Sequence, residues 1–162
     1  MDKILSNYKT GLKSFEHRRL VDFIYVESLL YGFNPELILA VITTESSFYN
    51  WSVSKKGALG MMQILPATGR ALAKSSRHIA WNGSKDTLFD PYVNIQLGIQ
   101  YLHKLNNTFS DLRTALTAYN YGPTRVRRWI RRGKSLPTGY ADRVLRAYRS
   151  YLPSRIPASN AT

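Results

Sequence analysis

The stretch from residue 34 to residue 68 constrains the fold more than any other part of the chain, because it opens with a strong helix signal. Asn34 can cap a helix, and Pro35 suits the first helical position, where a missing N–H leaves no bond unmade. Apolar residues then recur at spacings of three and four, at Ile38, Val41 and Ile42. The pattern predicts a helix that packs one face into a hydrophobic core.

Glu45 is the next residue on that apolar face, four positions after Val41 and three after Ile42. Burying a carboxylate is unfavourable unless it is paired or protonated, and burial raises the pKa of the group. A carboxyl placed in this way can act as a general acid at neutral pH. Periodicity alone also permits a helix-end glutamate that turns outward or pairs with a basic residue.

The segment after this helix has no acidic residue between positions 46 and 85. Gly57 and Gly60 suit a backbone that turns tightly or lets another group approach closely. Gln63 lies in a run of Met, Ile and Leu, and a polar amide in such a place needs a hydrogen-bond partner. A ligand can be that partner, and so can the backbone of the loop.

Several short motifs in this order and spacing resemble the catalytic core of soluble-type lytic transglycosylases. They are Glu45-Ser46, Ser54-x-x-Gly57-Ala58-x-Gly60, Met62-Gln63, Pro66-x-Thr68, the segment 94–105 and Ala118-Tyr119-Asn120-x-Gly122. The resemblance covers residues 27–151. The family usually has Gly-Leu-Met-Gln where this chain has Gly60-Met61-Met62-Gln63, and a Leu-to-Met change conserves volume.

The resemblance implies a mainly α fold, formed as a single lysozyme-like helical domain related to goose-type lysozymes. We expect residues 1–26 to form a loose lead-in and the start of a scaffold helix, residues 27–151 to form the catalytic domain, and residues 152–162 to form a tail. Further helices are expected at 67–73 and 91–105, from Leu112 and Pro123 onward, and at 140–151.

The resemblance also implies the site and the reaction. Glu45 is expected to act as the single acid and base that cleaves the β-1,4 bond between N-acetylmuramic acid and N-acetylglucosamine, forming a 1,6-anhydro product. Residues expected to bind the substrate, peptidoglycan glycan strands, are Ser54, Met62, Gln63, Tyr119, Asn120 and Tyr140. Tyr119 and Asn120 would hold the acid or the sugar, or Asn120 would instead tie down the helix start at Gly122-Pro123.

A hydrolase of the goose-lysozyme kind is the alternative enzyme, and it needs a second acid to position water. Glu27, Asp86 and Asp90 are the candidates, although Asp86 and Asp90 lie in a polar stretch where solvated charge or helix capping is expected. Without a second acid, the 6-hydroxyl of the sugar has the advantage of an intramolecular nucleophile. Trp81 is either a loop anchor or a surface on which a sugar stacks.

The chain is strongly basic, with 23 Lys and Arg against 10 Asp and Glu and a formal net charge of +13. Between positions 123 and 155 there are ten basic residues and one acid, Asp142. Such a surface attracts polyanions, so the charge fits a helical nucleic-acid-binding module as well as an anionic cell wall. Because no recognised reading helix or stacking motif is present, nucleic acid is not an expected partner.

Cysteine is absent and the three histidines lack metal-ligand spacing, so no metal or cofactor is expected. The chain has no run of 18 apolar residues and no hydrophobic core of a signal peptide near residues 1–20, so no transmembrane segment is expected. We expect a monomer that works in the periplasm or cell envelope and reaches it by a removed signal, phage lysis or a secretion machine. Retention of Glu45 argues against an inactive wall-binding protein.

Overall fold

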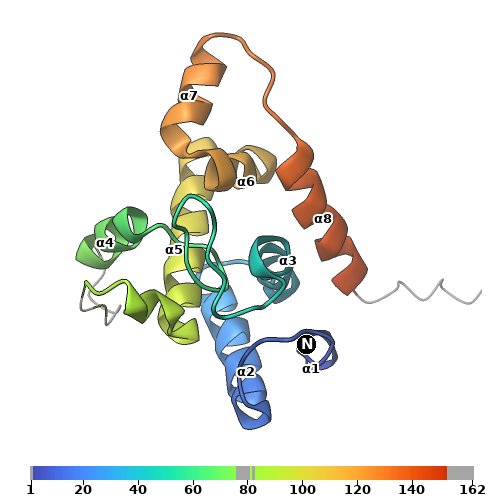
Figure 1. The fold of residues 1–162 in the computed structure, drawn as a ribbon. Helices are drawn as coiled ribbons and strands as arrows, with labels where there is room; N and C mark the ends of the chain where they lie inside the picture. The colour runs from blue at the N-terminus through green and yellow to red at the C-terminus, as the bar shows by residue number, and fades with distance from the viewer. Residues whose placement is uncertain (1, 76–80, 82, 153–162) are drawn as a thin grey trace, which may run out of the picture.

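The structure is a computed structural model that describes residues 2–75, 81 and 83–152 (Figure 1). Its helices are α1 (Asp2–Leu5), α2 (Ser14–Leu30), α3 (Pro35–Ser46), α4 (Pro66–Ser75), the short 3-10 helix η1 (Asp86–Phe89), α5 (Pro91–Phe109), α6 (Leu112–Tyr121), α7 (Pro123–Arg131) and α8 (Gly139–Tyr151). Within these described ranges the β structure is limited to two isolated bridges, Val53 to Leu59 and Leu59 to Ile64. The mainly α prediction is confirmed.

Helix α3 lies at the centre of the fold, between α2 and α8 (Figure 1). Its start follows the sequence signal, because the Asn34 side chain accepts a hydrogen bond of 2.9 Å from the Glu36 N–H and Pro35 takes the first helical position. Ile38, Val41 and Ile42 are fully buried. The buried face of the helix therefore holds its last turn, which carries Glu45, in a defined position.

The N-terminal segment belongs to the same hydrophobic core as the rest of the chain. Leu5 on α1 and Leu20 and Ile24 on α2 are buried in one cluster with the side chains of α3. The expected loose lead-in is therefore wrong at residues 2–5, which form a helix because Leu5 has an apolar contact surface to bury. The predicted boundary between residues 26 and 27 falls inside α2, and residues 153–162 of the expected tail lie outside the described residues.

A buried asparagine on α5 ties together the long loop between α3 and α4. The Asn94 side chain accepts a 2.7 Å hydrogen bond from the Met62 N–H and donates to the carbonyl oxygens of Leu59 at 2.9 Å and Leu88 at 2.8 Å. Gly60 permits this close approach, since a Cβ atom there would collide with the Asn94 amide and with the Leu88 carbonyl. Helix α5 thus holds the loop in place through the hydrogen bonds of Asn94.

Hydropathy along the described residues gives one weak membrane signal. No single helix is long and apolar enough to cross a membrane, but Glu16–Leu30 and Pro35–Ser46 satisfy the length and composition test together, as a pair bent by 117°.

Replacing Asn94 should weaken the fold markedly. Asn94→Ala removes three buried hydrogen bonds and leaves an N–H and two carbonyl groups without their partner, so we expect the free energy of unfolding to fall by about 2–4 kcal/mol. Urea denaturation followed by circular dichroism measures this change. The control Asn107→Ala, on the exposed side of α5, should change stability by less than about 0.5 kcal/mol. Equal effects of the two variants would contradict the anchoring role of Asn94.

Candidate active site

Glu45 lies in the last turn of α3, where the hydroxyl of Tyr140 on α8 donates a 2.5 Å hydrogen bond to its Oε1 atom. Burial raises the pKa of Glu45 to about 7, while the Tyr140 hydrogen bond and the positive charge of Arg143 act in the opposite direction. Desolvation dominates because it disfavours the charged carboxylate more than these two neighbours favour it. Glu45 therefore exists as a mixture of acid and carboxylate near neutral pH.

Helix α8 supplies both groups that act on the Glu45 carboxyl. Tyr140 and Arg143 are three residues apart on one helix face, and the Arg143 guanidinium lies 5.8 Å from the centre of the Tyr140 ring. Burial raises the pKa of Tyr140 well above its usual range, and the nearby Glu45 raises it further. Tyr140 therefore remains a proton-bearing hydrogen-bond donor to Glu45 over the whole physiological pH range.

An open pocket of about 330 Å³ lies against Glu45. Its lining includes Ser54 and Gln63 from the loop after α3 and Tyr119 and Asn120 from the end of α6. The structure thus brings together the acid and four of the residues expected to bind the substrate, from three separate parts of the chain. Their roles toward a substrate remain predictions.

The two loop residues in this pocket also hold the loop in shape. The Ser54 hydroxyl oxygen accepts hydrogen bonds from the N–H groups of Ala58 at 2.9 Å and Lys56 at 3.3 Å. The Gln63 side-chain nitrogen donates to the carbonyl oxygens of Gly60 at 2.9 Å and Ser52 at 3.1 Å. The backbone thus satisfies the donor end of the Gln63 amide, and its oxygen is the end suited to a ligand.

Met62 and Tyr140 occupy places that differ from the predicted substrate contacts. The Met62 side chain is fully buried, packed where any side chain at Gly98 would collide with it, so it cannot reach the pocket. Its carbonyl oxygen instead accepts a 2.8 Å hydrogen bond from the Tyr119 hydroxyl. Tyr140 is only 3% exposed and contacts the acid rather than the pocket. Both residues therefore stabilise other groups of the site, Met62 through its backbone and Tyr140 through its bond to Glu45.

Tyr119 and Asn120 are neighbours in the sequence but make different contacts in the structure. The Tyr119 hydroxyl donates its hydrogen bond to the Met62 carbonyl, so its proton is not available to the Glu45 carboxyl. Asn120 is exposed and lines the Glu45 pocket and also a neighbouring pocket of about 260 Å³. Asn120 is not the capping residue of the next helix, because the N-cap of α7 is Gly122.

The candidates for a second acid lie away from this pocket. Glu27 is 9% exposed on α2, where burial raises its pKa and Gln96 contacts it at 3.4 Å. Asp90 caps α5 by accepting hydrogen bonds from two backbone N–H groups, as the sequence suggested, and Asp86 lies in η1. Glu45 is the one acidic residue that lines the pocket within the described part of the chain.

Trp81 donates a 2.6 Å hydrogen bond from its ring nitrogen to the Ser84 carbonyl and packs over Gly69, so it anchors a loop.

Among the residues that the structure describes, no group of three or more His, Cys, Asp or Glu side chains is placed to hold a metal ion.

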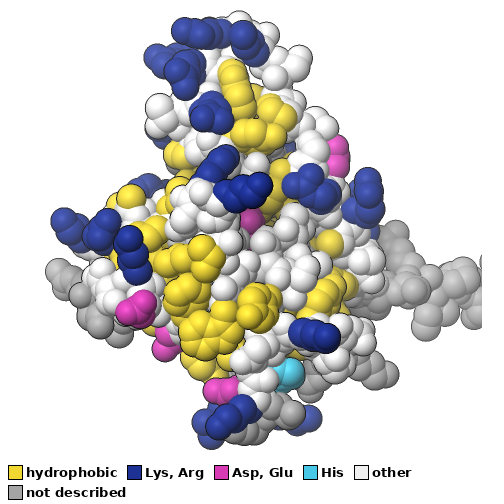
Figure 2. Space-filling model, viewed as in Figure 1, with side chains coloured by type: hydrophobic (Ala, Val, Ile, Leu, Met, Phe, Trp, Pro, Cys, Tyr) yellow, Lys and Arg dark blue, Asp and Glu magenta, His cyan; other side chains and the backbone are white. Residues whose placement is uncertain are grey.

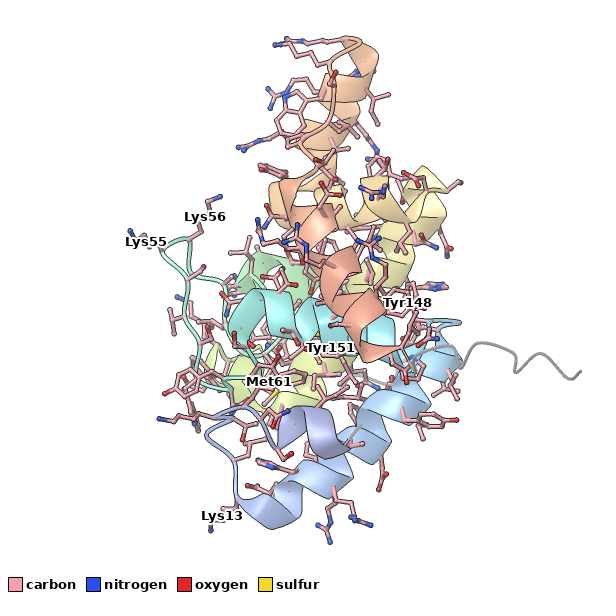
Figure 3. The ribbon with its side chains drawn as sticks, turned by 90° about the vertical axis from the view of Figure 1, so that its right-hand side faces the viewer. Lys13, Lys55, Lys56, Met61, Tyr148 and Tyr151 are labelled. Carbon is pink, nitrogen blue, oxygen red and sulfur yellow. The ribbon has the colours of Figure 1, made fainter. Side chains whose placement is uncertain are left out.

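The sequence interpretation missed three basic residues at the site. Lys55 and Lys56 line the Glu45 pocket from the tip of the loop, where Figure 3 shows both side chains directed outward. Both lysines could have been predicted as site residues from the sequence, because they lie between Ser54 and Gly57 of the Ser54-x-x-Gly57 motif. Arg143 could have been found from its helical spacing, three residues after Tyr140.

Replacing Tyr140 should shift the titration of Glu45 upward. In Tyr140→Phe the carboxylate loses a hydrogen bond that favours its charged form, so the pKa of Glu45 should rise above its wild-type value of about 7. NMR titration of the labelled glutamate side chain measures the midpoint directly. The matched variant Tyr25→Phe, at an exposed position of α2, should keep the wild-type midpoint. A lower midpoint in Tyr140→Phe would contradict the role given to this hydrogen bond.

Comparison with known proteins gives one consistent result. A family model described as the transglycosylase SLT domain matches residues 22–140. Membrane-bound lytic murein transglycosylase C of Shigella sonnei is 39% identical over 106 residues, which cover 60% of this chain and 30% of that protein.

Solved structures agree with the family match. The 70 kDa soluble lytic transglycosylase of Escherichia coli aligns with a TM-score of 0.72 and 30% identity, over 80% of this chain and 23% of that one. An inactive glutamate-to-glutamine mutant of lytic transglycosylase Slt from Pseudomonas aeruginosa aligns with a TM-score of 0.63 and 29% identity, over 79% of this chain and 21% of that one. The chain thus spans less than a third of the length of these relatives. It belongs to the transglycosylase SLT domain family and has the lysozyme-like helical fold of that family.

Proposed function

We propose that this protein is a peptidoglycan lytic transglycosylase that cleaves the β-1,4 bond between N-acetylmuramic acid and N-acetylglucosamine. The observation that carries the proposal is Glu45, a desolvated carboxyl with a pKa of about 7 at the wall of an open pocket. Membership of the family and the names of the relatives support the same activity. The inactive mutant of the Pseudomonas aeruginosa relative, in which a glutamate is replaced by glutamine, supports a single-glutamate mechanism.

In the first step Glu45 acts as the general acid. Its neutral carboxyl gives a proton to the glycosidic oxygen while the bond from that oxygen to the anomeric carbon of the muramic acid breaks. The 2-acetamido oxygen of the same sugar stabilises the cationic centre that develops. The carboxylate left on Glu45 keeps the hydrogen bond from Tyr140 and the nearby charge of Arg143, so the ion formed in this step is partly compensated.

In the second step Glu45 acts as the general base. Its carboxylate takes the proton of the 6-hydroxyl, the 6-oxygen bonds to the anomeric carbon, and the 1,6-anhydro ring closes with Glu45 again protonated. An intramolecular hydroxyl has a large effective concentration, which favours it over water. A pKa near neutrality suits a group that must give and take the same proton in one cycle.

The other pocket residues bind and orient the glycan in this proposal. Ser54, the amide oxygen of Gln63 and the side chain of Asn120 would hydrogen-bond the N-acetyl group and neighbouring hydroxyls from the pocket wall. Tyr119 acts indirectly, by holding the Met62 backbone that precedes Gln63. We further propose that residues 27–151, together with the N-terminal part of α2 that shares their core, form the catalytic unit. The protein acts as a monomer on glycan strands in the periplasm or cell envelope in this proposal.

Removing the proton of Glu45 should abolish the reaction. Glu45→Gln keeps the size of the side chain but cannot cycle a proton, so we expect the release of soluble fragments from purified peptidoglycan to fall at least about a thousandfold. Glu27→Gln is the matched control, because Glu27 is also a desolvated glutamate but lies outside the pocket; it should retain at least about half of the activity. Wild-type activity in a folded Glu45→Gln protein would rule out the mechanism.

The product should carry 1,6-anhydromuramyl ends. With Glu45 as the one acidic residue lining the pocket among the described residues, no second carboxylate is placed to activate water there. Mass spectrometry of the digest separates the outcomes, because an anhydro end is one water lighter than a reducing end. Digestion in ¹⁸O-labelled water provides the control, since a ring closed by the sugar's own hydroxyl takes up no label. Mostly labelled reducing ends would identify a hydrolase instead.

A further inference from the structure

We propose that a groove between α5 and α7 binds the acidic peptide branches that peptidoglycan strands carry on their muramic acid residues. The proposal rests on the function proposed above and adds a determinant of substrate choice to it. The α5–α7 groove is defined by eight residues: Tyr101, Lys104, Thr108 and Phe109 of α5, and Thr124, Arg127, Ile130 and Arg131 of α7. Helix α4 also lines its inner part, through residues such as Thr68 and Ala71.

The groove continues from the Glu45 pocket in steps that share lining residues. The pocket beside Glu45 and its neighbour, which contains Arg125, have five lining residues in common. That neighbour shares Thr68 and Tyr101 with a hollow of about 430 Å³, which in turn shares Thr108 and Arg127 with a hollow of about 510 Å³. The lining therefore advances along α5 and α7 together, away from the acid.

Every step along this path has a cation, and beyond the Glu45 pocket no step is lined by an acid among the described residues. The Glu45 pocket has Lys55 and Lys56, and the next has Lys56 and Arg125. The two outer hollows have Lys104, Arg127 and Arg131. Figure 2 shows the same tendency, with Lys and Arg side chains gathered over α7 at the top of the molecule.

The three groove cations are available to a ligand. Lys104, Arg127 and Arg131 are exposed, and no acidic side chain in the described ranges pairs with any of them. The contact that Arg127 does make is with the ring of Phe109, 5.9 Å from its centre, which leaves the guanidinium edge free to donate. Positive charge without internal partners favours a negatively charged occupant.

The apolar floor and the length of the groove favour a peptide. Tyr101, Phe109 and the 49% exposed Ile130 offer apolar surface between the cations. From Tyr101 to Phe109 the groove follows about 12 Å of helix, at about 1.5 Å per residue. An extended peptide of about four residues spans this length, at about 3.3 Å per residue. A short branch with aliphatic and carboxylate groups fits both features.

Continuity with the Glu45 pocket favours a peptide attached to the substrate over a separate polyanion such as nucleic acid. A glycan that extends from the Glu45 pocket into the neighbouring pocket reaches Tyr101, where the groove begins. A branch attached there binds at a high effective concentration and adds to the affinity of the sugar. Free polyanions lack this attachment. The groove cations should therefore lower KM for strands whose branches are charged.

The test compares three substrates made from one preparation of glycan strands: intact strands, strands stripped of peptide by an amidase, and strands whose carboxylates have been converted to methyl amides. The groove variant combines Lys104→Gln, Arg127→Gln and Arg131→Gln. For the wild type at low salt, kcat/KM on intact strands should exceed that on amide-capped strands roughly tenfold, the order expected for three exposed ion pairs. In the groove variant this ratio should fall toward one, mainly through a higher KM on intact strands.

A second variant with the same loss of charge serves as the control. Lys9→Gln, Arg19→Gln and Arg149→Gln remove three exposed cations that do not line the groove, and this variant should keep the wild-type ratio. If the groove triple variant is unstable, the single exchange Arg131→Glu should still lower the ratio about threefold, and Arg131→Lys should retain it.

Anhydro ends formed from any of the three substrates test the proposed function. The ratio of kcat/KM on intact strands to kcat/KM on amide-capped strands tests the groove. A wild-type ratio near one, or an unchanged ratio in the groove variant, would overturn the inference and leave the enzyme assignment intact. A result with nucleic acid would also overturn the inference. That result is a short single-stranded DNA that binds the wild type more tightly than intact glycan strands do and binds the groove variant weakly.

Discussion

The hydrogen bond from Tyr140 to Glu45 is the contact on which the arrangement of the site depends. It joins the last turn of α3 to the first turn of α8, two segments 95 residues apart in the sequence. A second contact holds the other end of α8, where the Tyr151 hydroxyl lies 2.7 Å from that of Thr43 on α3 (Figure 3). Helix α8 is thereby held across the last turn of α3, and Arg143 is close enough to influence the charge of Glu45.

The opposite wall of the pocket is fixed by a chain of bonds through the backbone of Met62. Asn94 on α5 accepts a hydrogen bond from its N–H, and Tyr119 on α6 donates one to its carbonyl. Three elements thus meet at a single buried residue, and Gln63 follows it directly into the pocket. The Ser46 hydroxyl adds a 2.8 Å hydrogen bond to the Met61 carbonyl, which links this wall to the helix that carries the acid.

The sequence predicted the parts of this structure that local chemistry decides. The start of α3 at Asn34-Pro35 and the buried face through Ile38 and Val41 follow from capping and periodicity, and the motif order placed Ser54 and Gln63 near Glu45. What it did not predict depends on contacts between distant segments. The hydroxyl of Tyr140 could have bound a sugar or an acid, and only the packing of α8 on α3 gives it the acid.

Met62 shows the same limit from another direction. Its place beside Gln63 in the motif suggested contact with the substrate, yet side chains of neighbouring residues in a turn can face opposite ways. Here the side chain at Met62 enters the core against Gly98, and the backbone carries its contribution to the site. A motif identifies positions that matter for a site, while the fold decides whether side chain or backbone acts there.

The fold tolerates a desolvated acid because apolar burial elsewhere on the same helix offsets its effect on stability. The pKa of Glu45 rises from 4.5 to about 7 on folding, so the stability linked to its bound proton is fully present below pH 4.5 and is lost as the pH rises through 7. That loss is about 3 kcal/mol at most. Full burial of two aliphatic side chains such as Ile38 and Ile42 contributes a similar amount, about 1.5–3 kcal/mol each. The apolar face of α3 thus stabilises a protein that contains a carboxyl whose pKa is raised by burial.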